Sequence, residues 1–179
     1  MGTKAARWQR SPYAADDGCV NVVVETPKGS RNKIKFDDDL DCFRLSDVLP
    51  AGNTFPYDFG FLPGTRAEDG DPIDVLLLMD ESTFPGTLVI SRLVGVIEGE
   101  QTEDGRTVRN DRLIAVSVDA RDYRDVHSVK DVSSHLIREL EHFFRSYAEM
   151  EGRKFRFRGL RGPRHAMKLV KRARLSRRR

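Results

Sequence analysis

The sequence predicts a mainly β fold of the α+β type, built as a closed or partly open β-barrel in one domain. Its apolar stretches are short, several of them alternate as half-buried strands do, and Pro or Gly residues separate them. Strong helical periodicity occurs only towards the C-terminus. The 179 residues, 39% hydrophobic and 33% charged, are ordinary for a globular protein that buries a single core.

The expected strands are joined by short turns. In the first strand, Val20, Val22 and Val24 alternate with neighbours that face the other way, and the strand ends at Pro27-Lys28-Gly29. The second strand is expected over residues 33–36, with a turn in the acidic stretch that follows. Later strands are expected at 73–79, 88–97 and 113–118, with an aromatic segment punctuated by Pro and Gly at 55–64 and a polar loop at 98–111.

Two helices are expected to flank the barrel. Residues 132–150 place apolar side chains at helical spacing, so one face of this helix should pack on the barrel. Either Ser133 or Asp131 can cap its N-terminus, and Gly152 can end it. A second helix is expected to begin after Pro163, because proline suits the first helical turn.

Charge is unevenly distributed along the chain. The formal net charge is +3, but residues 168–179 hold seven basic residues and no acidic one. Without these seven, 24 basic residues face 28 acidic ones, a formal charge of −4. A basic tail of this kind can bind nucleic acid, although a solvated helix end is the commoner explanation. We therefore divide the chain into a mobile N-terminal arm at 1–17, a barrel domain at 18–165 that includes the helix at 132–150, and a basic C-terminal helix or tail at 166–179.

The cysteines and the hydropathy pattern predict a cytoplasmic protein. Cys19 and Cys42 have neither metal-site nor redox spacing, so we expect reduced thiols. No apolar run approaches the roughly 18–20 residues that cross a bilayer, and the N-terminus lacks the apolar region of a signal peptide.

The segment Asp69-Gly70-Asp71-Pro72-Ile73-Asp74 carries the most chemical information in the chain. Its three carboxylates lead into the apolar stretch at 75–79, so a buried strand should anchor them. Carboxylate oxygens this close suit hard cations such as Mg²⁺ or Mn²⁺, which share their coordination with waters and phosphates. An Asp-Gly surface turn is the simplest alternative. A calcium loop of the EF-hand type does not fit, because Ile73 takes a ligand position and Asp74 takes that of the turn glycine.

Together with other segments, this motif resembles the soluble family I inorganic pyrophosphatases. The resemblance runs in unbroken order over roughly residues 20–165. The segments that carry it are residues 24–33, 55–61, 68–76, 85–86, 93–96, 113–116 and 142–147. The resemblance implies a five-stranded β-barrel of OB type with two flanking helices, a cytoplasmic enzyme and, in bacteria, commonly a hexamer.

The resemblance also implies Mg²⁺-dependent hydrolysis of inorganic pyrophosphate to two orthophosphates by a metal-activated water, with two or more ions per site and Mn²⁺ as a substitute. Clustered carboxylates suit this chemistry, because two ions about 3.5–4 Å apart can hold the attacking and leaving oxygens. Asp71 is then the catalytic residue that orients or deprotonates the water. The implied metal ligands are Asp69, Asp71, Asp74, Glu25, either Glu103 or Asp104, and either Asn110 or Asp111. The implied substrate-binding residues are Lys33, Lys35, Arg112 and Tyr147.

Five positions depart from the family pattern. Asp47 stands where the family has an arginine, and Lys35 stands where it has an acid. Phe59 replaces a phosphate-binding tyrosine, Ala148 replaces a lysine, and Asn110 replaces a metal-bridging aspartate. The three central aspartates match the family pattern, whereas several of the charged residues expected around them are replaced. Two alternatives stay open: a divergent subgroup with rearranged contacts, or an activity that is weakened or redirected.

Two other functions compete with pyrophosphate hydrolysis. One is hydrolysis of another phosphoanhydride, because the departures fall on substrate contacts. The other is an OB-type nucleic-acid-binding module without catalysis, which the basic tail and the aromatic Phe59 and Phe61 would favour. Against the module, the rest of the chain is acidic and the aspartate cluster repels phosphates unless a metal is bound. We therefore expect pyrophosphate and further copies of the chain as partners, and neither membrane nor nucleic acid.

Overall fold

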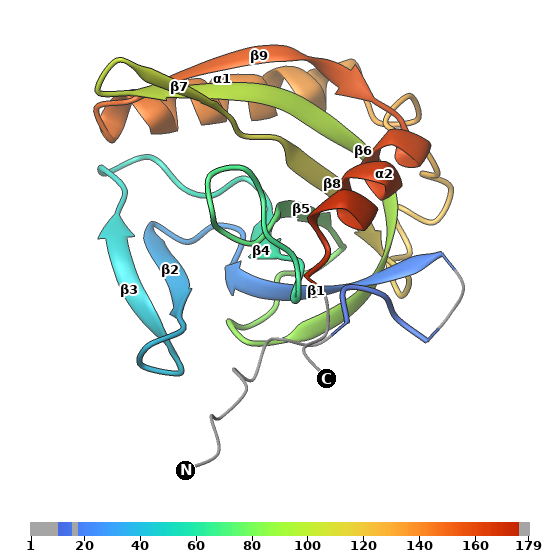
Figure 1. Ribbon diagram of the computed structural model, residues 1–179. Helices are drawn as coiled ribbons and strands as arrows, with labels where there is room; N and C mark the ends of the chain where they lie inside the picture. The colour runs from blue at the N-terminus through green and yellow to red at the C-terminus, as the bar shows by residue number, and fades with distance from the viewer. Residues whose placement is uncertain (1–10, 16–17, 176–179) are drawn as a thin grey trace.

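The structure, a computed structural model, describes residues 11–15 and 18–175 (Figure 1). The elements in chain order are β1 Cys19–Thr26, β2 Asn32–Asp37, β3 Cys42–Val48, β4 Asp58–Phe61, β5 Asp74–Leu78, β6 Leu88–Glu103, β7 Arg106–Arg109, β8 Arg112–Ser117, α1 Ser134–Met150, β9 Lys154–Arg161 and α2 Pro163–Ala173. Most of the predicted arm at 1–17 and the end of the predicted tail lie outside the described residues. The described part of the arm runs beside β1, where Tyr13 forms a bridge to Val20.

Five strands close into a ring, which confirms the predicted barrel. The pairs run β1–β4, β4–β5, β5–β8 and β8–β6, and β6 pairs with β1 to complete the ring. Only β5 and β8 are parallel within this ring. β7 and β9 pair with β6 beyond the ring, while β2 and β3 form a separate hairpin that projects from the barrel (Figure 1).

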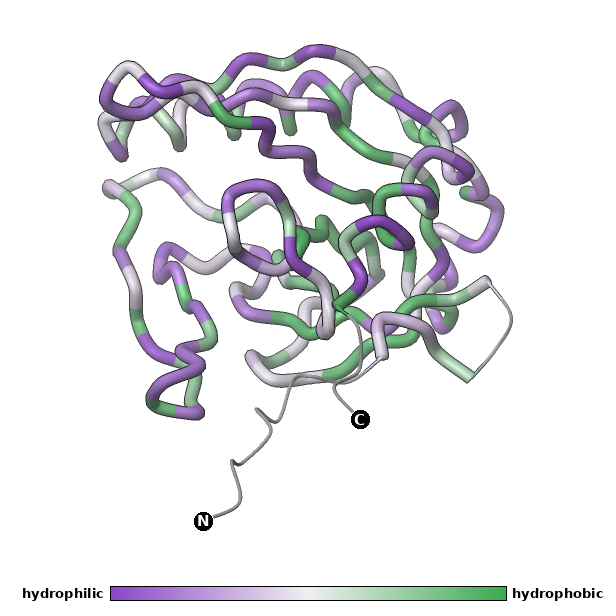
Figure 2. The backbone as a smooth tube through the Cα atoms, in the orientation of Figure 1, coloured by the Kyte–Doolittle hydropathy of each residue, from purple (hydrophilic) through white to green (hydrophobic). Residues whose placement is uncertain are grey.

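The barrel strands are buried on both faces, which explains their continuous apolar sequences. On β5, Val75 and Leu77 belong to one apolar cluster and Leu76 and Leu78 to another, as expected for side chains that alternate across a strand. α2 packs against the first cluster and α1 against the second. Figure 2 shows the hydrophobic colour gathered on these central strands, whereas the outer loops and hairpins are mainly hydrophilic.

Both predicted helices are present. α1 begins at Ser134 with Ser133 as its N-cap, and the Ser133 hydroxyl accepts a hydrogen bond from the Leu136 backbone N–H. Asp131, the alternative cap, instead accepts hydrogen bonds from backbone N–H groups before the helix. α2 begins at Pro163, as predicted. No helix in the described ranges is long and apolar enough to cross a bilayer.

The prediction of a loop at 98–111 is wrong, because the chain there forms a β-hairpin. β6 continues to Glu103 and returns as β7, and β9 pairs with the other edge of β6. The connection is the two-residue turn Asp104-Gly105, whose φ angles of +49° and +76° suit a tight hairpin. Ion pairs across the strands replace apolar contacts here, with Arg158 Nε 3.2 Å from Glu100 Oε1. The polar composition concealed the strands, although an Asp-Gly pair is itself a hairpin signal.

Candidate active site

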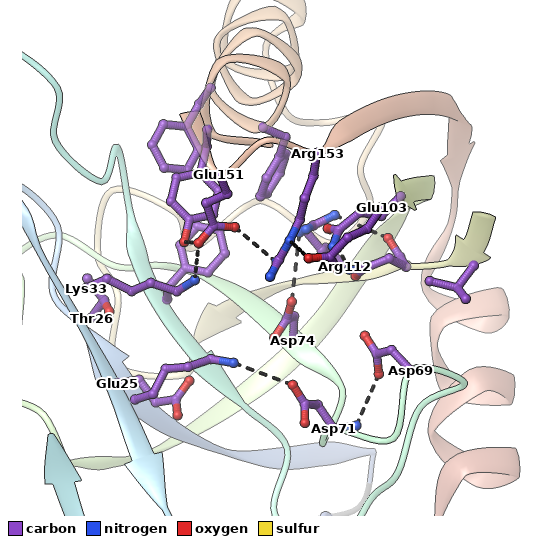
Figure 3. A pocket seen from close by; sticks show the side chains of 18 of the residues that line it. Glu25, Thr26, Lys33, Asp69, Asp71, Asp74, Glu103, Arg112, Glu151 and Arg153 are labelled. Atoms are coloured by element: carbon purple, nitrogen blue, oxygen red, sulfur yellow. Dashed lines mark hydrogen bonds and ion pairs between the residues drawn. The ribbon is translucent and has the colours of Figure 1, made fainter. Parts of the chain in front are cut away.

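A cavity of about 650 Å³ opens between β2, the acidic loop before β5, the β6–β7 hairpin and the end of α1 (Figure 3). Of the twelve predicted site residues, only Asp111 does not border it. The carboxylate of Asp111 accepts hydrogen bonds from the Gly99 backbone N–H at 3.0 Å and from Arg109 Nε at 2.7 Å. The predicted residues that border the cavity are Glu25, Lys33, Lys35, Asp69, Asp71, Asp74, Glu103, Asp104, Asn110, Arg112 and Tyr147.

The acidic loop owes its shape to Gly70 and to hydrogen bonds within the loop. Gly70 has a φ of +96°, a conformation that a side chain would strain. The loop closes where the Ala67 N–H donates to the Asp71 carbonyl at 2.7 Å, and the Asp71 N–H donates to Asp69 Oδ1 at 3.1 Å. β5 then begins at Asp74, so the three aspartates are held at the edge of the barrel and border the cavity (Figure 3).

Glu25 reaches the same cavity through a bulge in β1. The register against β4 slips between Val24 and Thr26, so Glu25 is the extra residue and its side chain is re-aimed. Burial, reinforced by the charge of Asp74, raises the pKa of Glu25 to about 7. Burial also raises the pKa of Asp69, and the neighbouring aspartates add to the effect. Negative charge is therefore crowded at this side of the cavity, and a bound cation would relieve the crowding.

One lysine faces the acidic loop directly. Lys35 Nζ lies 3.4 Å from Asp71 Oδ2. Burial acts to lower the pKa of Lys35, but the charges of Asp71 and Asp74 outweigh burial and leave the pKa raised. Lys35 is therefore a charged counter-ion that contacts the central aspartate and offsets part of the negative charge of the loop.

Arg112 is the first residue of β8 and carries a positive charge towards the acidic loop. Its guanidinium is buried against two rings, with Cζ 4.3 Å from the centroid of Phe144 and 4.8 Å from that of Phe155. Gly99 makes room for this arrangement, because a Cβ there would overlap the Phe155 ring. Burial lowers the pKa of Arg112, whereas Asp74, whose Oδ2 is 3.9 Å from Nε, acts to raise it.

Glu151 gathers the polar groups at the end of α1, although no sequence pattern singled it out. Its Oε1 accepts hydrogen bonds from Lys33 Nζ at 2.9 Å and from the Tyr147 hydroxyl at 2.8 Å, and its Oε2 accepts one from Arg153 Nη1 at 3.1 Å. Burial acts to raise the pKa of Glu151, but the hydrogen bonds from Lys33 and Tyr147 outweigh it and the pKa is lowered. The sequence signal that could have pointed to Glu151 is Gly152, because a glycine that ends a helix turns the chain back beside the last helical turn.

The family is decided by a match that spans most of the chain. Residues 22–177 fit the sequence profile of a family described as inorganic pyrophosphatase. The chain belongs to the inorganic pyrophosphatase family. The inorganic pyrophosphatase of Synechocystis sp. is 39% identical to it over 142 residues, which are 79% of this chain and 82% of that protein. That of Geobacillus stearothermophilus is 32% identical over 157 residues, which are 88% of this chain and 93% of that protein.

Solved structures of inorganic pyrophosphatases have the same fold. The enzyme from Thermus thermophilus superposes with a TM-score of 0.86 and 30% identity, covering 94% of this chain and 97% of that one. The enzyme from Neisseria gonorrhoeae gives a TM-score of 0.81 and 30% identity, covering 91% of this chain and 93% of that one. These matches confirm the predicted OB-type barrel with its two flanking helices.

Two of the positions predicted to depart from the family pattern do not border the cavity. Ala148 is 3% exposed in the apolar cluster under α1, and Asp47 is exposed on β3, opposite Lys33. Phe59 borders the cavity but packs among other aromatic rings, and Phe61 is 5% exposed. These two rings therefore do not form the exposed stacking surface that the nucleic-acid-binding alternative requires.

The carboxylates of the cavity form a donor set that suits a hard divalent cation, in keeping with the metal dependence of the pyrophosphatase family. Within the described ranges, no three Asp, Glu, His or Cys side chains come close enough to hold one ion between them as they lie. Mg²⁺ does not require such a cage, because it is usually held by one or two carboxylates while waters and substrate phosphates complete its octahedron. The crowded charge at Glu25 and Asp69 fits the same ion.

Proposed function

We propose that this chain hydrolyses inorganic pyrophosphate to two orthophosphates with Mg²⁺ as its metal. The observation that carries the proposal is a single cavity, also bordered by Tyr147, with the aspartates of the acidic loop on one side and Lys33 and Arg112 on the other (Figure 3). Carboxylates suit the cations, and the basic groups suit the phosphoryl oxygens. Membership of the inorganic pyrophosphatase family supports the same substrate.

The acidic loop is the proposed place of the metal. Asp69, Asp71 and Asp74 would hold it, with Glu25 at the edge of the site. The chemistry that bound Mg²⁺ supplies is neutralisation of the pyrophosphate charge, polarisation of the phosphoryl oxygens and a lower pKa for the attacking water. Ionisation of Glu25 is coupled to metal binding. Burial raises the pKa of its carboxyl group, and a nearby cation favours the ionised form.

The hairpin formed by β6 and β7 would supply the outer ligands. Glu103 is engaged with Arg153, since the Arg153 Nε lies 3.1 Å from Glu103 Oε1, so we propose Asp104 as the ligand from the turn. Asn110 borders the cavity and Asp111 does not, so the amide oxygen of Asn110 is the proposed ligand at the bridging position.

Asp71 is the proposed catalytic base. Its side chain is 67% exposed at the cavity, where it can accept a proton from water as the oxygen of that water attacks phosphorus and the bridging P–O bond breaks. Lys35 Nζ, 3.4 Å from Oδ2, holds the carboxylate in place. Lys33 and Arg112 donate to the phosphoryl oxygens and stabilise the charge that builds on the leaving phosphate, and Tyr147 joins them by turning its hydroxyl proton from Glu151 to the substrate.

Release of orthophosphate tests the proposed function. The purified chain is incubated with pyrophosphate, ATP or tripolyphosphate, each with Mg²⁺ and each with EDTA, and the orthophosphate formed is measured. We expect fast release from pyrophosphate that requires Mg²⁺, and much slower release from the other two substrates. Faster release from ATP or tripolyphosphate would assign another phosphoanhydride, and no release from any of them would reject hydrolysis.

The remaining proposals concern location and assembly, where the family suggests a cytoplasmic and self-associating enzyme. Cys19 and Cys42 are both free thiols, which suits a reducing compartment. Phe84 is 81% exposed and Leu40 is 65% exposed, so both are available for contacts between copies of the chain. Analytical ultracentrifugation tests the assembly, because a single species at the chain mass of 20.4 kDa would contradict it.

A further inference from the structure

Two buried side-chain donors in the described part of the chain lack a hydrogen-bond partner, and both are guanidinium Nε groups. They belong to Arg112 and Arg153, and both residues border the same cavity. A buried N–H that is left unpaired costs free energy, so native structures rarely keep one without a ligand or a water to meet it. Arg112 already has a proposed role in binding phosphoryl oxygens, which leaves Arg153 to be explained.

The position of Arg153 is fixed by the way α1 ends. Gly152 adopts a φ of +73°, and its N–H donates to the Glu149 carbonyl at 3.0 Å. The Arg153 N–H donates to the Ala148 carbonyl at 2.8 Å. Together these hydrogen bonds form a Schellman motif, in which the residue after the glycine turns back beside the last helical turn. The side chain of Arg153 thereby enters the cavity next to Glu151 (Figure 3).

Two carboxylates hold the Arg153 guanidinium without satisfying it. Nη1 donates to Glu151 Oε2 at 3.1 Å, and Nε lies 3.1 Å from Glu103 Oε1. The Nε–H does not point at the Glu103 oxygen, so this short separation is an ion pair without a hydrogen bond. An arginine has five N–H donors in a planar fork, and those that these acids leave unused can meet an anion that enters the cavity.

The resemblance to the pyrophosphatases implies positive charges at two positions near the end of α1 and on β3. Asp47 and Ala148 replace an arginine and a lysine, and neither residue borders the cavity. Arg153 enters from the helix end that carries Ala148, and it brings a guanidinium to the side where Lys33 and Arg112 lie. Arg153 thus adds a positive charge on this side of the cavity, which Asp47 and Ala148 do not supply.

We propose that Arg153 binds a phosphoryl group of pyrophosphate together with Lys33 and Arg112, and that Glu151 is its positioning residue. The inference rests on the proposed function, because it takes pyrophosphate as the ligand. A guanidinium can donate two parallel hydrogen bonds to one phosphoryl group, whereas an ammonium acts as a point charge. Arg153 would therefore orient the substrate as well as attract it.

Arg153→Ala tests the proposal with two measurements. The KM for pyrophosphate in excess Mg²⁺ should rise about tenfold with a smaller change in kcat, as expected for the loss of one charge-assisted hydrogen bond. Calorimetry with methylene diphosphonate, whose P–C–P linkage resists hydrolysis, should show a similar increase in Kd. Arg153→Lys keeps the charge without the fork and should recover only part of the loss. If the alanine variant does not fold, the same KM and Kd measurements are made on Arg153→Gln.

The matched control is Arg156→Ala, because Arg156 is exposed on β9 and is not among the residues that border the cavity. A parental KM and a parental Kd in folded Arg153→Ala would overturn the binding role. Equal losses in Arg156→Ala would assign the effect to overall charge and overturn it too. The parent is assayed first. If it releases no phosphate, the proposed function fails, while methylene diphosphonate binding still tests Arg153.

A double-mutant cycle tests the positioning role of Glu151. Glu151→Gln should raise KM in the parent but add little in the Arg153→Ala background, because its effect passes through the guanidinium. Fully additive losses would show that Glu151 acts through Lys33 and Tyr147 instead, and would overturn its assignment to Arg153.

Discussion

The two sides of the cavity are built in different ways. The three aspartates of the acidic side come from one stretch of chain, residues 69–74, and only Glu25 joins them from β1. The basic side gathers Lys33 from β2, Arg112 from β8 and Arg153 from the turn after α1. Metal ligands must converge on one ion at fixed distances, so the loop that carries them tolerates little change. Charge acts over several ångströms, so a phosphoryl-binding cation can come from any nearby element.

The largest expected effect of a single substitution is on the acidic side. Asp71→Asn should lower kcat for pyrophosphate by at least about 100-fold, the scale on which a positioned general base contributes. The amide keeps the size of the side chain but cannot take up a proton. Steady-state phosphate release measures the effect, and circular dichroism checks that the variant is folded.

Asp39→Asn is the control for this change, because Asp39 is exposed in the turn between β2 and β3. It should hydrolyse pyrophosphate at the parental rate. If folded Asp71→Asn also keeps that rate, Asp71 is not the base, and the acidic side loses the role that sets it apart from the basic side.

A smaller effect is expected from Arg112 on the basic side. Arg112→Gln should lower kcat/KM about tenfold, because one charge-assisted contact to phosphate is lost. Arg112→Lys should retain most of the activity, since a lysine keeps a positive charge close to the phosphoryl oxygens. Equal losses in the two variants would instead mean that packing against Phe144 and Phe155 matters more than charge.

Short-range patterns in the sequence were enough to predict the barrel and the acidic side. The alternation of Val20, Val22 and Val24 gave β1, and helical spacing over 132–150 gave α1. The apolar run after Asp74 gave β5, which is buried on both faces. Each of these signals acts within a few residues of chain, where local geometry decides the outcome.

The basic side and the edge of the sheet depend on contacts that the sequence does not reveal. Glu151 accepts a hydrogen bond from Lys33, which is 118 positions away in the sequence. In the sequence alone, a Glu followed by Gly152 resembles any helix end, so this contact could not be predicted. β3, β4 and β9 were not predicted, and β9 alternates basic residues with Phe155 and Phe157, which pack with α1 in the folded chain. Such pairings exist only after the elements meet.

Acid unfolding offers a smaller test of the basic side. The pKa of Glu151 lies below its ordinary value of 4.5, because hydrogen bonds from Lys33 and Tyr147, with the charge of Arg153, outweigh burial. A lowered pKa means that the stabilisation is fully present above pH 4.5 and is lost as the pH falls through the folded value. Glu151→Gln should therefore be less stable than the parent by about 1 kcal/mol at pH 7, and the difference should shrink in acid.

Urea unfolding at neutral and acidic pH measures this difference. Glu149→Gln is the control, because Glu149 is exposed in the last turn of α1 and should show no such pH dependence. A gap between the parent and Glu151→Gln that stays constant with pH would mean that the charge of Glu151 does not stabilise the fold.

The smallest expected effect lies where the two sides meet, at Asn110. An amide in place of a bridging carboxylate keeps an oxygen ligand but removes a negative charge, so Mg²⁺ should bind more weakly here than at a complete carboxylate site. Asn110 borders the cavity, and its Nδ2 donates to Gln101 Oε1 at 3.2 Å. Asn110→Asp should therefore lower the Mg²⁺ concentration needed for half-maximal activity, with little change in kcat.

The adjacent Asp111 supplies the opposing test. Its carboxylate accepts from the Gly99 N–H and Arg109 Nε, so Asp111→Asn should lower the free energy of unfolding by about 1 kcal/mol and leave the Mg²⁺ requirement unchanged. If instead Asp111→Asn raises the Mg²⁺ requirement while Asn110→Asp has no effect, Asp111 turns into the cavity when metal binds. If neither variant alters the Mg²⁺ titration, the hairpin contributes no metal ligand at these positions, and the metal is held by the acidic loop and Glu25.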